Sequence, residues 1–303
     1  MAVYSIAKYK AILENQDAWI QPAFKKPQLD IVWNRDYSTV GGLFSVNTIS
    51  GRVKLAFYDN AMERYFDGSW RFGTAKLVNK HGKWFLHIPC SKKFEEPAGD
   101  CYQNIVGVDL GVNFTAVAYC SDGRTIFYSG KKVKHKRAGY KAVRQQLQRR
   151  QTPSSRRRLK SIGSRENRWV QDVNHCVSKA LVTSQQKGTL FVLEDLAGIR
   201  GATEKVSLKQ RYVIVSWSFY DLRQKITYKA AMRGSTVVAV DPAHTSQECP
   251  ACGHTKRGNR DKKLHMFHCK KCGYRSNDDR SGGMNLHRKG IEYLAKTQLT
   301  QAV

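Results

Sequence analysis

The chain has 303 residues, of which 41% are hydrophobic, enough for one sizeable core and a smaller second domain, and this argues against disorder throughout. Lysine and arginine number 52 against 24 aspartate and glutamate, so the formal net charge is +28 and the expected partner is a polyanion, most simply nucleic acid. A membrane fits less well, because the sequence has no apolar run of about 18 residues and no basic amphipathic anchor. No apolar signal segment follows Met1, so we expect a cytoplasmic protein.

Residues 1–103 alternate apolar and polar side chains in short runs broken by glycine, which predicts a small β-barrel or sandwich domain. The expected strands are 42–48, 51–57, 73–78 and 83–88, with a hairpin turn at 79–82. Basic residues alternate here with four aromatic residues, Trp33, Trp70, Phe72 and Trp84. Such a pattern suits stacking on bases beside phosphates, and the alternative is that these rings form the barrel core.

A linker rich in Pro, Gly and acid is expected at 95–100, and the second domain follows at 104–303. Its first three strands, 105–113, 114–119 and 125–129, should form an antiparallel meander because Ser121, Asp122 and Gly123 make a turn. We then expect a helix, a strand at 189–196, a polar loop at 200–211, a helix at 217–233, a strand at 236–241 and a final helix beginning near Asn277. This order predicts an RNase H-like α/β fold.

The segment 131–187 forms a basic helical insertion in this scheme. Residues 131–168 contain almost no acid and too few apolar residues for a core, so they read as a pair of helices that grip a sugar-phosphate backbone. The alternative is a solvated charged face. Residues 169–186 carry apolar side chains at helical spacing and should form a separate helix that packs on the sheet.

Four of the eight cysteines occur as two Cys-x-x-Cys pairs within 246–276, separated by a gap of about sixteen residues. This is the spacing of a zinc ribbon with the ligands Cys249, Cys252, Cys269 and Cys272, and the alternative is four unrelated buried thiols. Because four thiolates fill the coordination sphere, one structural zinc ion is expected. His265 and His268 lie inside the loop and are at best spare ligands.

Three carboxylates lie where apolar packing does not explain them, and they are the candidate catalytic residues. Asp109 is the single acid of an apolar strand, Glu194 lies in a second apolar strand with Asp195 as its rival, and Asp279 follows Asp278 at the start of the last helix. Oxygen ligands from separate elements are what two Mg²⁺ ions need for phosphodiester hydrolysis. Asp279 has an alternative role as a helix cap.

Several motifs together resemble the RuvC nuclease core of the transposon-encoded TnpB proteins and their relatives, the type V CRISPR effectors. They are residues 106–111, 193–196, 217–219, 228–230, 240–242, 245–249 and the ribbon. The resemblance implies a Mg²⁺-dependent, RNA-guided DNA endonuclease of a prokaryotic cytoplasm and nucleoid, whose partners are a guide RNA and a target DNA. It also implies that the three catalytic acids map onto Asp109, Glu194 and Asp279, and that the β-rich front is a wedge domain.

The chain departs from the family pattern at two places. Family members usually carry a helical recognition region near the first barrel strand, and only about forty residues precede Phe44 here. The family also favours two alanines where Gly282 and Gly283 stand, and two glycines in a helix cost about 1 kcal/mol each, so Asp279 is expected on a looser element.

Two alternative functions use the same residues. One is an RNA-guided DNA-binding protein or regulator that does not cut both strands productively. The other is a Holliday-junction resolvase on the same fold, which accounts for the carboxylates but for neither the ribbon nor the basic helices. The sequence makes no prediction of oligomeric state.

Overall fold

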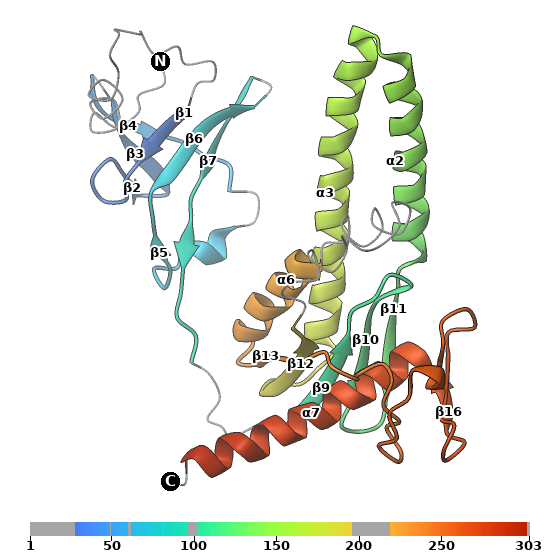
Figure 1. Ribbon diagram of the computed structural model, residues 1–303. Helices are drawn as coiled ribbons and strands as arrows, with labels where there is room; N and C mark the ends of the chain where they lie inside the picture. The colour runs from blue at the N-terminus through green and yellow to red at the C-terminus, as the bar shows by residue number, and fades with distance from the viewer. Residues whose placement is uncertain are drawn as a thin grey trace, which may run out of the picture. The chain divides into compact units, whose positions relative to one another are not determined.

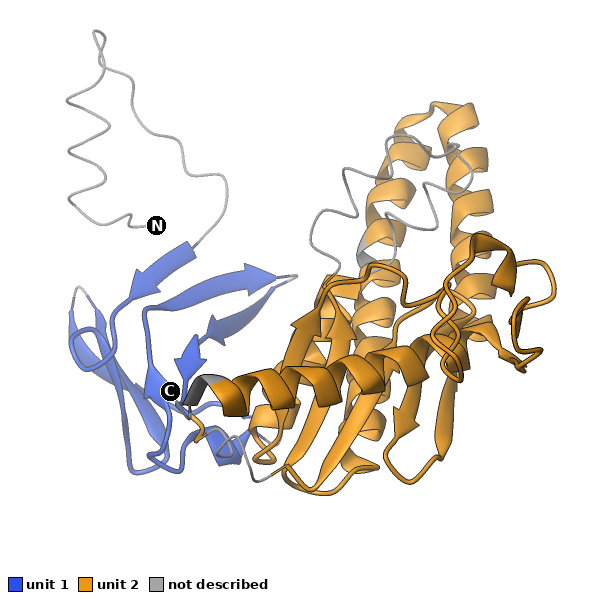
Figure 2. Ribbon diagram, turned by 60° about the horizontal axis from the view of Figure 1, so that its bottom comes forward, with its two compact units in different colours: residues 1–93 blue, residues 94–303 orange. Residues whose placement is uncertain are grey.

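A computed structural model describes residues 28–48, 50–59, 62–80, 82–95, 102–195 and 219–301. The chain divides into two compact units, Met1–Lys93 and Phe94–Val303, drawn in different colours in Figure 2. Most of the predicted linker, the predicted loop at 200–211 and the predicted helix start at 217–218 lie outside the described residues. Each unit is described by itself.

The first unit contains three small sheets, and the predicted strands and hairpin are confirmed. Their strand orders are β1-β6-β7, β2-β3-β4 and β5-β8. The strands are β1 (Gln28–Ile31), β2 (Tyr37–Val40), β3 (Leu43–Thr48), β4 (Gly51–Leu55), β5 (Arg71–Phe72), β6 (Ala75–Lys80), β7 (Lys83–His87) and β8 (Cys90–Ser91), with a 3-10 helix, η1 (Glu63–Tyr65). Among the described residues no ladder joins the three sheets, so closure into one barrel stays a prediction.

The aromatic residues of the first unit divide into core and exposed side chains, and base stacking by the exposed ones stays a prediction. Trp33 and Phe72 have ring centroids 4.8 Å apart, and Trp33 packs against a core that includes the fully buried Tyr37. Trp84 on β7 is instead 58% exposed. The pattern of alternating aromatics therefore marks core on one strand face and open surface on another.

The second unit is built on one mixed five-stranded sheet with the order β11-β10-β9-β12-β13. Strands β9 and β10 and strands β10 and β11 are antiparallel, whereas β12 runs parallel to both β9 and β13. The predicted meander and element order are confirmed. The strands are β9 (Asn104–Asp109), β10 (Phe114–Cys120), β11 (Thr125–Ser129), β12 (Thr189–Glu194) and β13 (Thr236–Val240).

Helices cover both faces of this sheet (Figure 1). Helix α7 (Asp278–Gln301) crosses one face, while α3 (Pro153–Thr183) and α6 (Phe219–Ala231) cover the other, and α2 (Lys131–Arg150) pairs with α3. The ribbon adds η3 (Arg257–Asn259), β14 (Arg260–Asp261), β15 (Met266–His268) and β16 (Arg275–Asn277). None of the helices in the described ranges combines the length and the apolar character needed to span a bilayer.

The predicted break between a basic helix pair and a sheet-packing helix is wrong. Residues 153–183 form one continuous helix of 31 residues, which begins at Pro153 with Thr152 as its N-cap. Pro is favoured in the first helical turn, and Thr152 accepts a hydrogen bond from the Ser155 N–H. No proline within the helix after Pro153 interrupts it. Its basic first half extends beyond the sheet, and its apolar second half, with the buried Leu181 and Val182, packs on the sheet.

Strand alternation decides which way the two strand acids face. In β12, Phe191 and Leu193 belong to the core with α3 and α6, whereas Leu190 and Val192 belong to the core with α7. Successive side chains in a strand point to opposite faces, so Glu194 shares the α7 face. By the same alternation Asp109 shares the face of Ile105. Both acids end parallel neighbouring strands, whose Leu193 and Val108 are paired.

Glycines allow α7 to lie directly on that face. A Cβ on Gly107 of β9 would fall 2.1 Å from the carbonyl oxygen of Gly283 and 2.4 Å from the backbone nitrogen of His287. A Cβ on Gly290 would fall 2.5 Å from Cγ2 of Val192. The prediction that Gly282 and Gly283 loosen this helix is therefore wrong, because they lie in a continuous α7 and permit its close approach to the sheet.

Candidate functional site

The four predicted zinc ligands lie together at the end of the ribbon. Their sulfur atoms are all within 4.8 Å of one another, with Sγ–Sγ distances of 3.6 Å for Cys249–Cys272 and for Cys252–Cys269. A tetrahedral ion with Zn–S bonds of about 2.3 Å separates its sulfurs by about 3.8 Å, so the cluster has the size that zinc requires.

Each cysteine pair is followed by a glycine that closes a tight turn. Gly253 and Gly273 have φ angles of +71° and +74° and donate backbone hydrogen bonds to the carbonyl groups of Cys249 and Cys269. The Lys271 and Cys272 N–H groups point at the Cys269 sulfur. Burial acts to raise the pKa of Cys269, but hydrogen bonds from these N–H groups and from the Cys272 and Cys252 side chains together lower the pKa to about 6, so the thiolate is favoured at this position.

A cleft of about 420 Å³ lies beside the ribbon and contains all three candidate catalytic carboxylates. Asp109 and Glu194 reach it from the ends of β9 and β12, and Asp279 reaches it from the first turn of α7. The fold thus brings together three residues separated by 85 positions each (109 to 194, and 194 to 279). The cleft lies beyond the carboxyl ends of parallel strands, where ligands bind in open α/β sheets.

The carboxylates make a strongly electronegative cleft. Burial, followed by the charges of Glu194 and Asp279, raises the pKa of Asp109 well above its ordinary value. Burial also raises the pKa of Glu194, and burial together with the neighbouring Asp278 raises that of Asp279. Three oxygen donors that resist ionisation without a cation are a suitable donor set for divalent ions.

Glu194 is held in the cleft from the loop that follows β13. The Thr245 hydroxyl donates a hydrogen bond to its Oε1. Asn285 of α7 is fully buried and donates through Nδ2 to the carbonyl oxygens of Thr245 and Glu248, both at 2.8 Å. A chain of hydrogen bonds therefore joins α7 to Glu194 through the loop.

Arg260 brings a positive charge into direct contact with acids of the cleft. Its Nε lies 2.8 Å from Asp278 and its Nη2 lies 3.3 Å from Asp279. The Asp278 side chain is completely buried in this pair, which leaves Asp279 as the acid of the two that is less tightly held. The alternative of Asp279 as helix cap is wrong, because the Asn277 side chain accepts the hydrogen bond from the Arg280 N–H.

The three carboxylates share the cleft but form a looser group than the cysteines. In the ranges that the structure describes, the four cysteines are the only set of three or more Cys, His, Asp or Glu whose ligand atoms all lie within 4.8 Å. Asp195, the predicted rival of Glu194, points elsewhere and pairs with Arg223 at 3.0 Å.

Sequence reasoning missed the residues that complete the cleft. Arg260 bonds to acids of the cleft, Thr245 bonds to Glu194, and Asn285 bonds to the loop behind them. Arg260 does not stand out among 52 basic residues, and the motif 245–249 contains Thr245 without indicating its contact with Glu194. His265 was considered only as a spare zinc ligand. It lines the cleft instead, with its ring 3.0 Å from the Asn113 side-chain amide.

Two family models match the chain, mostly within the second unit. One, described as the Cas12f1-like TNB domain, matches residues 219–286, and the other, described as a probable transposase, OrfB_IS605, matches residues 87–197. The first match includes the ribbon and Asp279, and the second match includes Asp109 and Glu194.

Curated relatives match most of the chain. A Cas12f1 CRISPR-associated endodeoxyribonuclease of Syntrophomonas palmitatica is 29% identical, over 91% of this chain and 59% of the relative. The RNA-guided DNA endonuclease InsQ of Escherichia coli K12 is 28% identical, over 73% of this chain and 57% of the relative. A TnpB-like protein of Methanocaldococcus jannaschii, MJ0751, is 28% identical over 75% and 83%. The chain thus spans a little under three fifths of the first two relatives.

Solved structures agree at the level of the fold. A Cas12f1–sgRNA–target DNA complex matches 88% of this chain and 68% of its own with a TM-score of 0.50 and 14% identity. The mini-RNA-guided endonuclease CRISPR-Cas_phi3 matches 81% of this chain and 57% of its own with a TM-score of 0.54 and 14% identity. The two family models and the curated relatives agree with one another: this chain is similar in sequence to the TnpB-like and Cas12f proteins.

Proposed function

We propose that the protein is an RNA-guided DNA endonuclease of the TnpB type, whose second unit is an RNase H-like domain that hydrolyses phosphodiester bonds with two divalent ions. What supports this most is the convergence of Asp109, Glu194 and Asp279 on one cleft. The family relation supports the choice of substrate, because relatives carry the names RNA-guided DNA endonuclease and endodeoxyribonuclease.

Asp109, Glu194 and Asp279 would hold the ions, which are most simply Mg²⁺. Such ions, when bound, activate the attacking water and stabilise the leaving 3′-oxygen of the scissile phosphodiester. The chain itself contributes by keeping these carboxylates buried and oriented, since Thr245 fixes Glu194 and α7 fixes Asp279. Zinc would be structural, held by the four cysteines, and the ribbon would present Arg260 to the cleft.

The phosphate of the substrate strand would meet basic side chains at the same cleft. Arg260 and Lys262 both line it, and His265 lies on the same wall. These groups suit a nucleic-acid backbone that carries one negative charge per nucleotide. Residues 1–103 would be the wedge domain and the helices within 131–187 would lie beside nucleic acid, while base pairing with a guide RNA would select the target sequence.

Cleavage by an Asp109→Ala variant tests this proposal. The protein is purified with its bound RNA, that RNA is sequenced, and DNA carrying the complementary target is added in Mg²⁺ or in EDTA. We expect the unsubstituted protein to cut only in the divalent ion, and we expect Asp109→Ala to lose about three orders of magnitude of activity or more while keeping RNA and target binding.

Asp122→Ala is the matched control, because Asp122 is an exposed acid in the turn after β10 and lies outside the cleft. It should cut like the unsubstituted protein. Undiminished cutting by Asp109→Ala would disprove the proposed site. If the unsubstituted protein and Asp109→Ala both bound the target and neither cut it, the alternative function of an RNA-guided DNA-binding regulator would be the correct one.

A further inference from the structure

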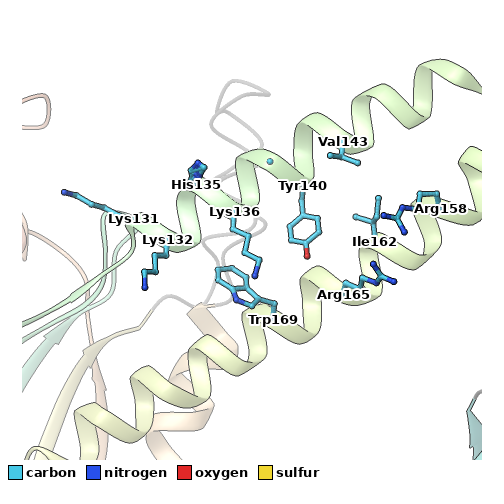
Figure 3. Close-up of a pocket in the computed structure, with 11 residues that line it drawn as sticks. Lys131, Lys132, His135, Lys136, Tyr140, Val143, Arg158, Ile162, Arg165 and Trp169 are labelled. Carbon is cyan, nitrogen blue, oxygen red and sulfur yellow. The ribbon is translucent and has the colours of Figure 1, made fainter.

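A second groove, which the cleavage mechanism does not use, lies between helices α2 and α3 (Figure 3). Its volume is about 920 Å³, larger than the carboxylate cleft. Each helix contributes one stripe, spaced as residues on one helical face are. The α2 stripe is Lys131, Lys132, His135, Lys136, Gly139, Tyr140 and Val143, and the α3 stripe is Arg158, Ile162, Arg165 and Trp169.

The floor of the groove is apolar and aromatic. Tyr140 from α2 and Trp169 from α3 both point into the space between the helices (Figure 3). Both rings are half-buried, and the neighbouring Val143 is 41% exposed. A surface of this kind between two helices is normally covered, so it suggests a ligand with a flat, apolar face.

The rim of the groove is cationic. Lys131 and Lys132 lie at one end and Arg158 at the other (Figure 3), and none of the lining residues is acidic. Glu166, an acid on the same stretch of α3, is buried in an ion pair with Arg144 and so does not offset this charge. The ligand should therefore carry anionic groups beside its flat face.

Lys136 marks where a flat group would lie. Its ammonium nitrogen is 4.3 Å from the centroid of the Trp169 ring, so this exposed, flexible lysine covers the indole face that borders the groove. A planar base that entered here would take that face, and Lys136 would move to the phosphate of the same nucleotide. Only an unpaired base offers an open π-face, since both faces are covered inside a duplex.

We infer that the groove between α2 and α3 is a binding site for unpaired nucleotides, in which a base stacks on Trp169 and Tyr140 while Lys131, Lys132, Lys136 and Arg158 contact the phosphates. This goes beyond a general attraction of basic helices to a backbone, because it assigns stacking to two particular rings. It rests on the proposed function only in taking nucleic acid as the partner.

Affinity measurements on the Asp109→Ala background test the inference without cleavage. Fluorescence anisotropy gives the Kd of labelled single-stranded RNA, single-stranded DNA and a duplex at several salt concentrations. Trp169→Ala should weaken binding of single strands about 5- to 150-fold, as loss of one stacked base does, with little change for the duplex. Trp169→Phe, which keeps a ring, should stay within about threefold of the parent protein.

The charge on the rim has a different signature. Lys136→Ala should reduce the slope of log Kd against log salt for single strands by about 0.7, whereas Trp169→Ala should leave that slope unchanged. Lys179→Ala removes an exposed lysine on α3 outside the groove and is the control for net charge. Photocrosslinking to iodouracil-substituted strands should label Trp169 or Tyr140, and the RNA and DNA strands compared side by side identify which of the two the groove prefers.

Two results would overturn the inference. Equal weakening of single strands and duplex by Trp169→Ala would mean that the ring only holds the helix pair together, and circular dichroism would show that loss of structure. Unchanged affinity for every probe in both Trp169→Ala and Trp169→Phe would mean that no base stacks there. Neither result depends on cutting, so a failure here is distinct from a failure of the proposed nuclease site.

Discussion

Asp109 is partly buried and carries its carboxylate into the cleft beside two other acids. Burial is the largest cause of its raised pKa, and the charges of Glu194 and Asp279 add to it. Arg260 acts in the opposite direction, yet its guanidinium is bonded to Asp278 and Asp279. Ionisation of Asp109 is therefore unfavourable in the absence of divalent ions, and the raised pKa values of Glu194 and Asp279 have the same sign, which is typical of a site that receives a cation.

Substitution of Asp109 by Asn should stabilise the metal-free protein at neutral pH while it abolishes cleavage. The pKa of Asp109 is higher in the folded state than in the unfolded state. The protein is therefore most stable below the unfolded carboxyl pKa of about 3.9, and it loses stability as pH rises through the folded pKa of Asp109. Asn carries no charge, so the variant escapes that loss, and its advantage should grow with pH. Thermal melts in EDTA measure this, at about 2–4 °C for each kcal/mol.

Asp122→Asn provides a control with the opposite sign. Hydrogen bonds from the Arg124 backbone and side chain lower the pKa of Asp122, so its contribution is present above the unfolded value and is lost as pH falls. This variant should therefore be less stable than the parent at neutral pH and should equal it in acid. If Asp109→Asn behaved like Asp122→Asn, the site would contain no uncompensated charge.

At the scale of elements, α7 positions the third carboxylate by its contact with the sheet. Glycines on both sides let the helix approach, and a Cβ on Gly282 would fall 2.9 Å from Oδ2 of Asp109 itself. The helix therefore has almost no freedom to shift along β9. The close packing that these glycines permit offsets their cost in intrinsic helix propensity.

Two Gly→Ala substitutions separate propensity from packing. Gly290→Ala in α7 would press its methyl group against Val192 and Ile105, at 2.5 Å and 2.8 Å from their Cγ2 atoms, and should destabilise the protein by about 1–3 kcal/mol. Gly163→Ala in α3 meets nothing within 4 Å and should stabilise it by about 1 kcal/mol. Urea unfolding measures both. A stabilising Gly290→Ala would contradict the close packing.

At the scale of the whole molecule, the ribbon connects the four-cysteine cluster to the carboxylate cleft. It carries Arg260 on β14, and its last strand, β16, leads directly into α7. The four cysteines and the candidate catalytic acids are therefore joined through the ribbon and α7, although no residue belongs to both groups. The same second unit carries the basic groove between α2 and α3, while the first unit is compact by itself.

Removal of zinc should weaken the second unit and leave the first unchanged. Metal analysis should find about one zinc per chain, lost in Cys269→Ser and kept in Cys176→Ser, which changes an exposed thiol outside the cluster. Zinc binding contributes about 10–16 kcal/mol to small zinc-finger domains, so its loss should unfold the ribbon. Hydrogen exchange should then rise in residues 246–277 and at the start of α7, with residues 28–93 unaffected. Unchanged exchange in the ribbon would disprove a structural role for the metal.

The sequence by itself determined the features that depend on local pattern. Two Cys-x-x-Cys pairs predict a ribbon because their spacing is a local constraint, and an acid alone in an apolar strand is visible without any partner. Local apolar patterns likewise predict four of the eight strands of the first unit, β3, β4, β6 and β7, and all five strands of the large sheet in the second unit. The catalytic candidates Asp109, Glu194 and Asp279 could be named for this reason, and the structure brings them to one cleft.

Only the tertiary structure decided which residues surround those acids. Arg260 comes from β14, Thr245 from the loop after β13 and Asn285 from α7. No local spacing in the sequence reveals that these three residues contact the acids or the loop behind them. The continuity of α3 and the value of the glycines in α7 were also misjudged from sequence, because packing against a distant strand outweighs local propensity. Sheet register and helix approach set these contacts, and both are properties of the folded chain.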